Sequence, residues 1–307
     1  MEPLPTPRRR PFTALAWAGI VAPFLAGAVL RLWHIRDQIL GGDEVHAIRA
    51  AVGFSLPKIL TTYQQTDNCI PLTAFYKLVI LGGAPVSEMV LRLPALLCGL
   101  AALLALPAAF EGRVSRATVL VYRWLVAVSP LLVLYSRIAR SYLPMVLLSF
   151  GAVWAFEAWW RTRSWKAGAA YVALGGLAVW FHLGAGPIVA APFLFAAGEA
   201  LFRRKPRRDF KRDLRDLIGL GLGLTAGFAL FLVPAWGSFV ALVSTKHAEQ
   251  TVPWGEVIPA LLRLGAGTAS GWLAAAFWIA ALAGLALLWR SRRRLAVYTA
   301  TVVAGHV

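Results

Sequence analysis

Long apolar runs separated by short basic clusters constrain this chain more than any other feature of its sequence. A helix needs about 20 apolar residues to cross the ~30 Å hydrocarbon layer of a membrane, because it rises ~1.5 Å per residue. With 59% hydrophobic residues and a mean hydropathy of +0.67, the chain has more apolar surface than a soluble domain could hide. We therefore expect an all-α, polytopic transmembrane helical bundle. Its candidate spans are 12–32, 90–110, 119–135, 143–160, 168–183, 185–202, 217–236 and 268–289.

The basic residues indicate how these spans are oriented. The net charge is +17, but the lysines and arginines gather in short clusters between apolar runs, as they do in cytoplasmic loops. This distribution favours a membrane protein over a nucleic-acid-binding one. We expect residues 1–11 to form a cytoplasmic N-terminus, and the run after it to be a retained first span rather than a signal peptide. The clusters assigned to the cytoplasm are Arg8–Arg10, Arg113 with Arg116, Arg161–Lys166, Arg203–Arg215 and Arg290–Arg294.

An even number of spans must separate neighbouring cytoplasmic clusters. This condition determines whether the run 70–81 is predicted to cross the membrane. Three apolar runs lie between Arg10 and Arg113, so one of them does not cross. The run 70–81 is the shortest and contains Lys77, and runs of this length are typically interfacial or re-entrant. We expect residues 33–89 to form one long outer loop within a single transmembrane domain, 12–307, of about eight or nine spans. The last run, from Leu295, is shorter than a span, which predicts a short last helix or a longer gene product.

Two helices are expected to lie on the membrane within this outer loop. In 43–54, Val45, Ile48 and Val52 recur at helical spacing and form an apolar stripe typical of an interfacial amphipathic helix. The second expected helix is 70–81, where Pro71 suits the first turn.

The adjacent acids Asp43 and Glu44 follow two glycines just beyond the first span. Carboxylates there can cap a helix and interact with the positive end of its dipole. They can equally supply a general base, or bind a metal ion, at the outer membrane face. The two interpretations are compatible, since a cap also fixes a catalytic carboxylate in place.

Four further candidates lie on the same side of the predicted membrane. Asp67 either ends a loop or provides a second outer acid. Arg137 and Arg140, in SRIARSY, share one helical face in a short outer link, where positive residues are uncommon. They suit a phosphate partner, or alternatively lipid headgroups. Tyr142 is an interfacial anchor or a hydrogen-bond donor.

His182 ends the run AAYVALGGLAVWF and is either interfacial or part of a site. The sequence contains no P-loop, HExxH, paired CxxC or GxSxG motif. Soluble nucleotide chemistry and zinc-protease chemistry therefore have no support.

In this order, these elements resemble the C-type superfamily of membrane glycosyltransferases, most closely family 39, which includes protein O-mannosyltransferases and aminoarabinose transferases. A first span is followed by the Asp43–Glu44 pair, the Pro-Leu segment IPLTAFYKL, the Arg-Leu-Pro element LRLPALLCG, SRIARSY and His182. The resemblance covers roughly the first two thirds of the chain. Many bacterial relatives have His and Pro where this chain has Cys69 and Ile70, and the C-terminal spans are missing or shortened.

The resemblance implies that a sugar moves from a polyprenyl-phosphate donor to a lipid, glycan or protein acceptor at the outer or periplasmic face of the plasma (inner) membrane, with inversion. Asp43 would be the acceptor base, assisted by Glu44, and the substrate-binding residues would be Asp67, Arg137, Arg140, Tyr142 and His182. No cofactor is required, and a divalent metal ion at Asp43 and Glu44 is an additional option. The alternatives are a transporter or flippase, and a degenerate transferase that only binds a lipid-linked sugar.

Overall fold

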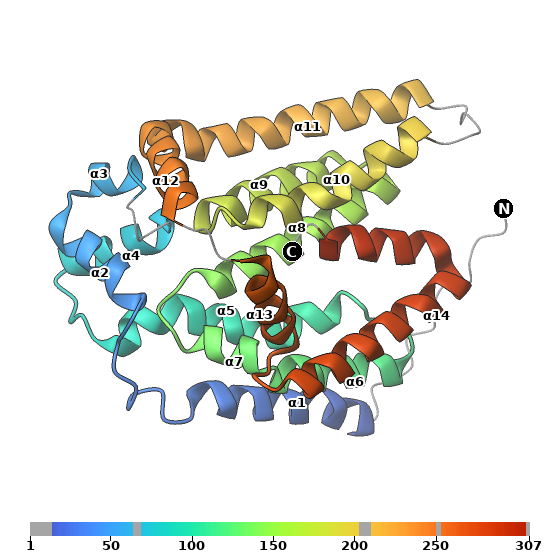
Figure 1. Ribbon diagram of the computed structural model, residues 1–307, viewed down its shortest axis with the longest axis horizontal. Helices are drawn as coiled ribbons and strands as arrows, with labels where there is room; N and C mark the ends of the chain where they lie inside the picture. Colours follow the sequence, from blue (N-terminus) through green and yellow to red (C-terminus); the bar gives the residue numbers. More distant parts are fainter. Residues whose placement is uncertain (1–13, 64–68, 203–209, 250–252, 305–307) are drawn as a thin grey trace.

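The computed structural model describes residues 14–63, 69–202, 210–249 and 253–304, and in these ranges every regular element is helical. The longer helices run side by side along one direction, and the helices of the first long loop gather at one end of them (Figure 1). This confirms the expected helical bundle. The bundle helices are α1 (Ala14–Leu32), α5 (Glu88–Ala108), α6 (Arg116–Val128), α7 (Pro130–Ser136), α8 (Tyr142–Thr162), α9 (Trp165–Phe181), α10 (Ala185–Phe202), α11 (Phe210–Leu232) and α14 (Gly271–Ala304).

Several of these helices are long and apolar enough to cross a membrane. Among the described residues, four qualify, in 88–108, 142–162, 210–245 and 271–290, and a fifth is obtained if α6 and α7 count as one bent span. The helices α1 and α10 are apolar but shorter in their described parts. The chain therefore has the character of a multi-pass membrane protein, with fewer long spans than the eight or nine expected from the sequence.

Helix breaks at proline account for part of this difference. The run predicted as one span, 119–135, is divided at Ser129, and the two halves are bent by 49°. Pro130 has no N–H to continue the helix, and the Ser129 side chain instead accepts a hydrogen bond from Leu132 N. After α11, the short 3-10 helix η1 (Val233–Ala235) precedes α12 (Trp236–Glu249), which turns across the end of the bundle.

The first long loop forms three helices rather than the two expected. They are α2 (Glu44–Gly53), α3 (Leu56–Leu60) and α4 (Ile70–Leu81). In α2, Val52 of the expected apolar stripe is exposed, whereas Ala47, Ala50 and Ala51 are buried against the protein; contact of the stripe with lipid stays a prediction. The small alanines allow α2 to pack closely with α4, whose Leu72 and Tyr76 are buried in the same cluster. The side of the membrane on which this loop lies stays a prediction.

Two glycines allow the bundle helices to approach one another closely. A Cβ atom at Gly99 of α5 would lie 2.1 Å from Ser136 Oγ, and one at Gly27 of α1 would lie 2.6 Å from Leu103 Cδ2. Either contact would be a clash, so α5 packs tightly on α1 and α7. A second core is formed by α8, α9, α10 and α11 around Phe156, Tyr171 and Val189.

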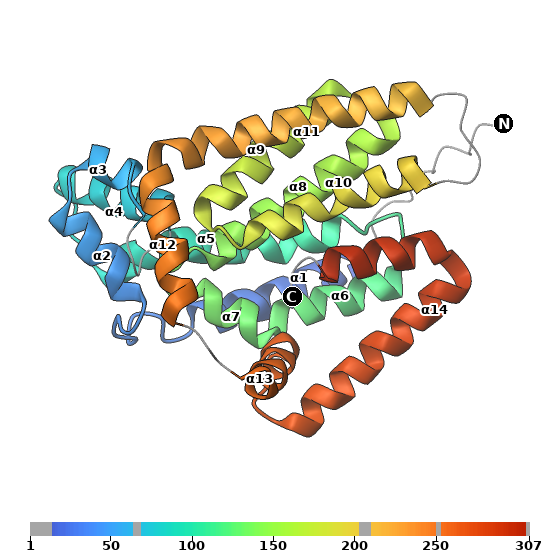
Figure 2. The same cartoon turned by 45° about the horizontal axis from the view of Figure 1, so that its top comes forward.

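The C-terminal part differs from the sequence prediction. The basic cluster Arg290–Arg294, expected to be a loop, lies within α14, and Arg293 stacks over the Trp289 ring. The helix bends partway along its length, and its last part returns toward the bundle (Figures 1 and 2). There Ala296 is buried. Arginine is a good helix former, so a basic cluster alone does not end a helix.

Candidate functional site

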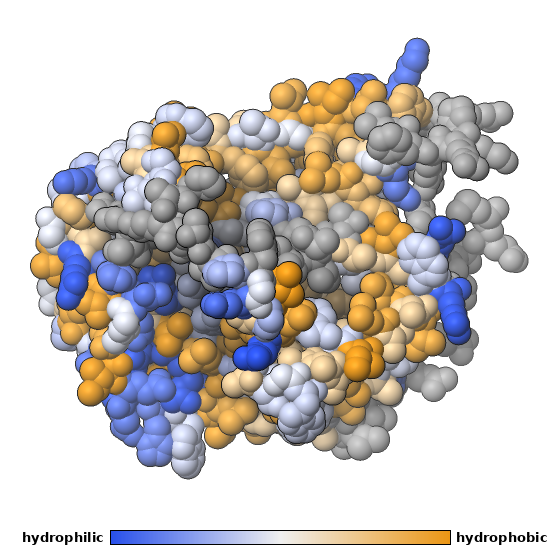
Figure 3. Space-filling model, in the orientation of Figure 1, coloured by the Kyte–Doolittle hydropathy of each residue, from blue (hydrophilic) through white to orange (hydrophobic). Residues whose placement is uncertain are grey.

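Most of the polar residues singled out in the sequence come together at one end of the bundle, where α2, the link 137–141, the start of α8 and the end of α9 meet. Figure 3 shows hydrophilic residues gathered at this end, around α2 and the segment after α1, while much of the remaining visible face is apolar. A polar region at the end of an apolar bundle is suited to chemistry at a membrane surface.

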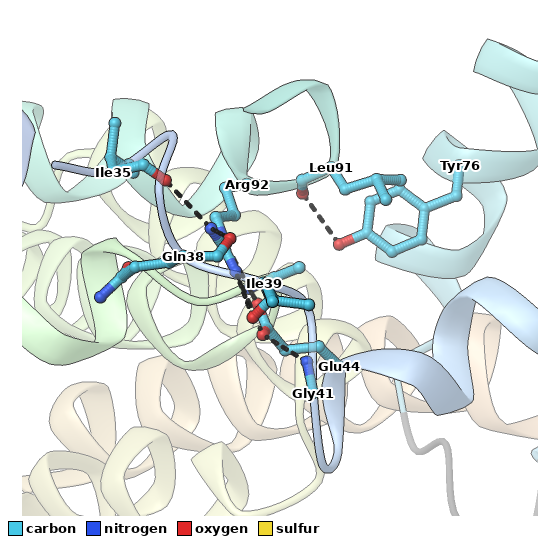
Figure 4. A network of polar contacts seen from close by, with 9 residues as sticks. Ile35, Gln38, Ile39, Gly41, Glu44, Tyr76, Leu91 and Arg92 are labelled. Carbon is cyan, nitrogen blue, oxygen red and sulfur yellow. Dashed lines mark hydrogen bonds and ion pairs between the residues drawn. The ribbon is translucent and has the colours of Figure 1, made fainter. Parts of the chain in front are cut away.

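Glu44 and Arg92 form a buried ion pair beneath this surface (Figure 4). Their side chains are 9% and 1% exposed. Arg92 Nε and Nη2 donate to the two carboxylate oxygens of Glu44 at 3.3 and 3.4 Å. Glu44 also accepts from Ala139 N at 2.6 Å and from Gly41 N at 3.3 Å. Both oxygens of Glu44 are therefore engaged, and the carboxylate joins α2, α5 and the link 137–141.

Arg92 also holds the segment between α1 and α2. Its Nη1 donates to the carbonyls of Ile35 and Gln38, at 3.1 and 2.8 Å, and its Nη2 donates to Ile39 O at 3.3 Å. One guanidinium thus binds three backbone carbonyls and a carboxylate, which suits its planar set of donors. The sequence singled out LRLPALLCG but assigned no role to this arginine.

Asp43, next to Glu44, is in the opposite situation. Its side chain is 74% exposed, and although it occupies the N-cap position of α2 it makes no capping hydrogen bond. Its carboxylate lies 3.9 Å from Arg140 Nη2 and 4.0 Å from His46 Nε2, both beyond hydrogen-bond distance. Asp43 therefore presents an open carboxylate whose backbone is fixed by its buried neighbour.

Arg140 lies beside Asp43 and connects it to Tyr142 and His182 through successive contacts. Arg140 Nη1 donates to Asp43 O at 3.0 Å, and the Arg140 guanidinium lies 5.7 Å from the centre of the Tyr142 ring. The Tyr142 ring in turn packs against His182, with ring centres 5.4 Å apart, and against Tyr135 at 4.6 Å. Residues separated by more than a hundred positions thus form one continuous polar and aromatic surface.

Arg137 does not share a face with Arg140, as the sequence had suggested, because residues 137–141 form a bend rather than a helix. Arg137 Nη1 and Nη2 donate to Leu30 O and Trp33 O, at 3.1 and 2.7 Å. These carbonyls lie at the end of α1, where carbonyl groups have no helical partner. Arg137 thus joins the link 137–141 to the end of α1, although its buried Nε has no hydrogen-bond partner among the described residues.

A second fully buried arginine, Arg31, was missed in the sequence analysis. Its guanidinium donates to Val126 O and Ala127 O at the end of α6, to Gly27 O, and to Ser136 Oγ. The helix break at Pro130 leaves these α6 carbonyls without their usual partners, and a cation is favoured at a helix C-terminus. A single arginine at the end of an apolar run was the available signal.

Asp67 lies outside the described residues. Cys69, just after that gap, is buried and precedes α4. Nearby, Tyr63 N donates to Ser238 Oγ at 2.8 Å, which ties the loop to α12. Burial raises the pKa of Tyr63 to about 12, and the negative charge of the Cys69 thiolate adds to this effect. The phenol therefore stays neutral at ordinary pH.

The pair Asp43–Glu44 does not fit a shared metal site, because Arg92 and two backbone amides already engage both oxygens of Glu44. Within the described ranges, no three His, Cys, Asp or Glu side chains are grouped to hold a metal ion. The geometry therefore separates the two acids into a structural residue and an open one.

Comparison with protein-family models, with curated proteins and with solved structures gives no match.

Proposed function

We propose that this chain is a membrane glycosyltransferase that moves a sugar from a polyprenyl-phosphate donor to a hydroxyl acceptor at the outer face of the membrane, as its resemblance to the C-type superfamily implies. The observation that carries the proposal is the contrast between two adjacent acids. Glu44 is buried and engaged with Arg92, whereas Asp43 is open and lies beside Arg140, which in turn lies near the Tyr142 ring that packs on His182.

In the proposed reaction, Asp43 accepts the proton of the acceptor hydroxyl. The acceptor oxygen then forms a bond to the anomeric carbon from the side opposite the phosphate. The bond between that carbon and the phosphate oxygen breaks, and the polyprenyl phosphate leaves with the electron pair. A positioned base of this kind contributes ~10²–10⁴-fold to the rate.

Negative charge grows on the departing phosphate, and Arg140 is suited to stabilise it. Its side chain is held by the Asp43 carbonyl and the Tyr142 ring, so the charge is already oriented before the reaction. Arg137 would contribute less than the sequence had suggested, because both of its Nη atoms donate to carbonyls at the C-terminal end of α1. His182 and Tyr142 would contact the sugar or its phosphate beside Arg140.

The test compares Asp43→Asn with the parent in proteoliposomes supplied with a panel of polyprenyl-phosphate hexoses and pentoses and with candidate acceptors. Asp43→Asn keeps the shape of the side chain and should lower transfer ~10²–10⁴-fold, while unfolding and donor binding stay unchanged. Asp37→Asn is a matched control, since Asp37 is also an exposed acid and its carboxylate is paired with the exposed His34. Transfer by Asp43→Asn at the parent rate would remove Asp43 from the mechanism.

Arg140→Gln addresses the donor side. Loss of a charge-assisted contact costs ~1.5–3 kcal/mol, which corresponds to roughly one to two orders of magnitude in donor affinity. The measurement is binding of the polyprenyl-phosphate sugar to the reconstituted protein. Arg36→Gln, an exposed arginine on the segment after α1, serves as the control. Donor binding that depends on Arg140, without any transfer, would instead favour a protein that only binds or moves lipid-linked sugar.

A further inference from the structure

The helix α11 has an outward face that the proposed function does not use. Along it, Lys211, Arg215, Ile218 and Leu222 follow one another at intervals of four, three and four residues. At about 100° per residue, these four side chains fall within about 60° of the helix surface. Ile218 and Leu222 are 54% and 67% exposed, and both cations are exposed as well. The face therefore passes from positive charge to exposed apolar surface along one line.

The opposite side of α11 packs on the bundle. Leu217, Leu220 and Leu224 are buried there in one cluster with residues of α8, α9 and α10. A Cβ atom at Gly175 of α9 would lie 3.2 Å from Leu224 Cδ1, so the two helices are in close contact. In both ribbon views α11 lies along the edge of the bundle (Figures 1 and 2). Its outward face is thus left in contact with whatever surrounds the bundle.

The start of α11 stands at the level where the neighbouring helices also leave their apolar part. Both α8 and the stretch that begins with α11 are long and apolar enough to cross a membrane. Arg163, just after α8, donates to Asp213 in the first turn of α11 at 2.6 Å, which brings the two ends together. Trp165, the first residue of α9, is 75% exposed, and tryptophan is enriched at membrane–water interfaces. If α8 and α11 cross, the two cations of the outward face stand at the level of the lipid headgroups, and its two apolar residues at that of the acyl chains.

Positive charge is in excess at the beginning of α11. Asp216 lies 4.0 Å from Arg212 and 3.3 Å from Arg215, so one carboxylate is shared by two guanidinium groups. Three exposed cations on neighbouring helix ends have no ion-pair partner among the described residues, and they are Arg161, Lys166 and Lys211. Exposed basic residues beside a membrane-crossing helix attract the phosphates of anionic lipids.

We propose that the outward face of α11 binds an anionic phospholipid, with the lipid phosphate at Lys211 and Arg215 and an acyl chain along Ile218 and Leu222. Figure 3 shows hydrophilic residues where α11 begins, beside apolar surface along its following turns. A phospholipid matches this face better than a soluble anion does, because the apolar half is exposed directly next to the charged half. The proposal does not rest on the glycosyltransferase reaction.

The test uses full-length protein in vesicles of phosphatidylcholine that contain a minor fraction of phosphatidylglycerol. A trace of one or the other lipid carries a photoreactive group on its acyl chain, and the adducts are mapped by mass spectrometry. The measured quantity is the adduct yield from the phosphatidylglycerol probe divided by that from the phosphatidylcholine probe. Each basic residue at an anionic membrane surface contributes about five-fold to affinity, so this ratio should be at least about five-fold higher on Ile218 and Leu222 than on α14.

The reference residues on α14 are Ile279 and Leu282, which are 68% and 62% exposed. They match the apolar half of the α11 face, but no lysine or arginine lies within seven residues of either. The helix α14 packs on α13 (Trp254–Ala266) and α10, so it reports general contact with lipid at another place on the bundle.

The double variant Lys211→Gln/Arg215→Gln removes the charges and keeps the apolar residues of the face. The ratio on α11 should then fall to the value found on α14. The matched control is Arg36→Gln/Arg49→Gln, which removes two exposed arginines at the α2 end and should leave the ratio on α11 unchanged. A parent ratio on α11 equal to that on α14, or one that survives the loss of both cations, would overturn the proposal.

A second measurement needs no substitution and applies if the double variant does not fold. The ratio is followed in the unmodified protein as salt is raised from about 0.05 M to about 0.5 M, because exposed charges act over a shorter distance at higher ionic strength. The preference for phosphatidylglycerol on α11 should fall several-fold, while the ratio on α14 stays constant. A preference on α11 that does not respond to salt rules out a headgroup site at the two cations.

Discussion

At the end of the bundle that carries α2, the ion pair between Arg92 and Glu44 is 1% and 9% exposed, whereas at the opposite end the pair between Arg113 and Glu157 is 33% and 38% exposed. Each pair joins two segments that are distant in sequence. The two pairs differ in their environment. The first is enclosed by backbone amides and carbonyls, whereas the second is partly exposed.

This difference in exposure predicts how much each ion pair contributes to the stability of the fold. A buried charge that loses its partner remains in a medium of low polarity and is strongly destabilising, whereas an exposed pair exchanges its contact for water at little cost. The half-buried pair between Arg163 and Asp213, where Arg163 also stacks on Trp160, lies between these extremes. The α2 end is therefore expected to depend on its ion pair, and the opposite end to tolerate the loss of one.

Removal of Arg92 is expected to have the largest effect. Arg92→Leu leaves the Glu44 carboxylate buried without its cation and frees three backbone carbonyls, and we expect a loss of ~3–5 kcal/mol in the free energy of unfolding. The measurement is unfolding in mixed micelles by titration with dodecyl sulfate, followed by tryptophan fluorescence.

The double variant Glu44→Leu/Arg92→Leu serves as the control for this prediction. It removes the unpaired charge together with its partner, so it should be less destabilised than Arg92→Leu alone. If the single variant is as stable as the parent, the enclosed pair does not hold this end of the molecule together.

Replacement of Glu44 by glutamine should have the next largest effect. Glu44→Gln can still accept a hydrogen bond from Ala139 N, but its amide group would oppose the donors of Arg92. We expect a loss of ~1.5–3 kcal/mol, the usual contribution of a hydrogen bond to a charged group. The same titration measures it, with Asp43→Asn beside it as the open neighbour that should change stability by less than ~0.5 kcal/mol.

The helices were largely predictable from the sequence. A long apolar run indicates a helix, because a helix satisfies its own backbone hydrogen bonds in an apolar environment. The run 119–135 was one exception, since Pro130 inside it divides α6 from α7. On α2 the limit of the sequence was different. Helical spacing of Val45, Ile48 and Val52 identified the apolar side chains, but the side that packs is set by the small alanines, which permit close contact with α4.

Four of the residues singled out in the sequence lie near one another in the fold, but the sequence did not distinguish their surroundings. The proximity of Asp43, Arg140, Tyr142 and His182 to one another agrees with their expected position on one membrane side. Nothing in the sequence distinguished Asp43 from Glu44, since only the fold places Arg92 under one of them. The part played by Arg31 was equally hidden, because its partners are backbone carbonyls that any residue at 126 and 127 would provide.

The smallest effect is expected at the opposite end, where Glu157→Gln removes the charge that faces Arg113. Both side chains are about a third exposed, so each can be solvated when the pair is broken, and exposed pairs contribute only ~0–1 kcal/mol. We expect a change in unfolding free energy of at most ~0.5 kcal/mol, further reduced by added salt. The dodecyl sulfate titration at two ionic strengths measures both quantities. Asp213→Asn provides a graded reference, because its partner Arg163 is less exposed and donates to no other carboxylate in the described residues. A loss at Glu157 as large as that at Glu44 would mean that exposure does not set the strength of these pairs, and the contrast between the two ends would fail.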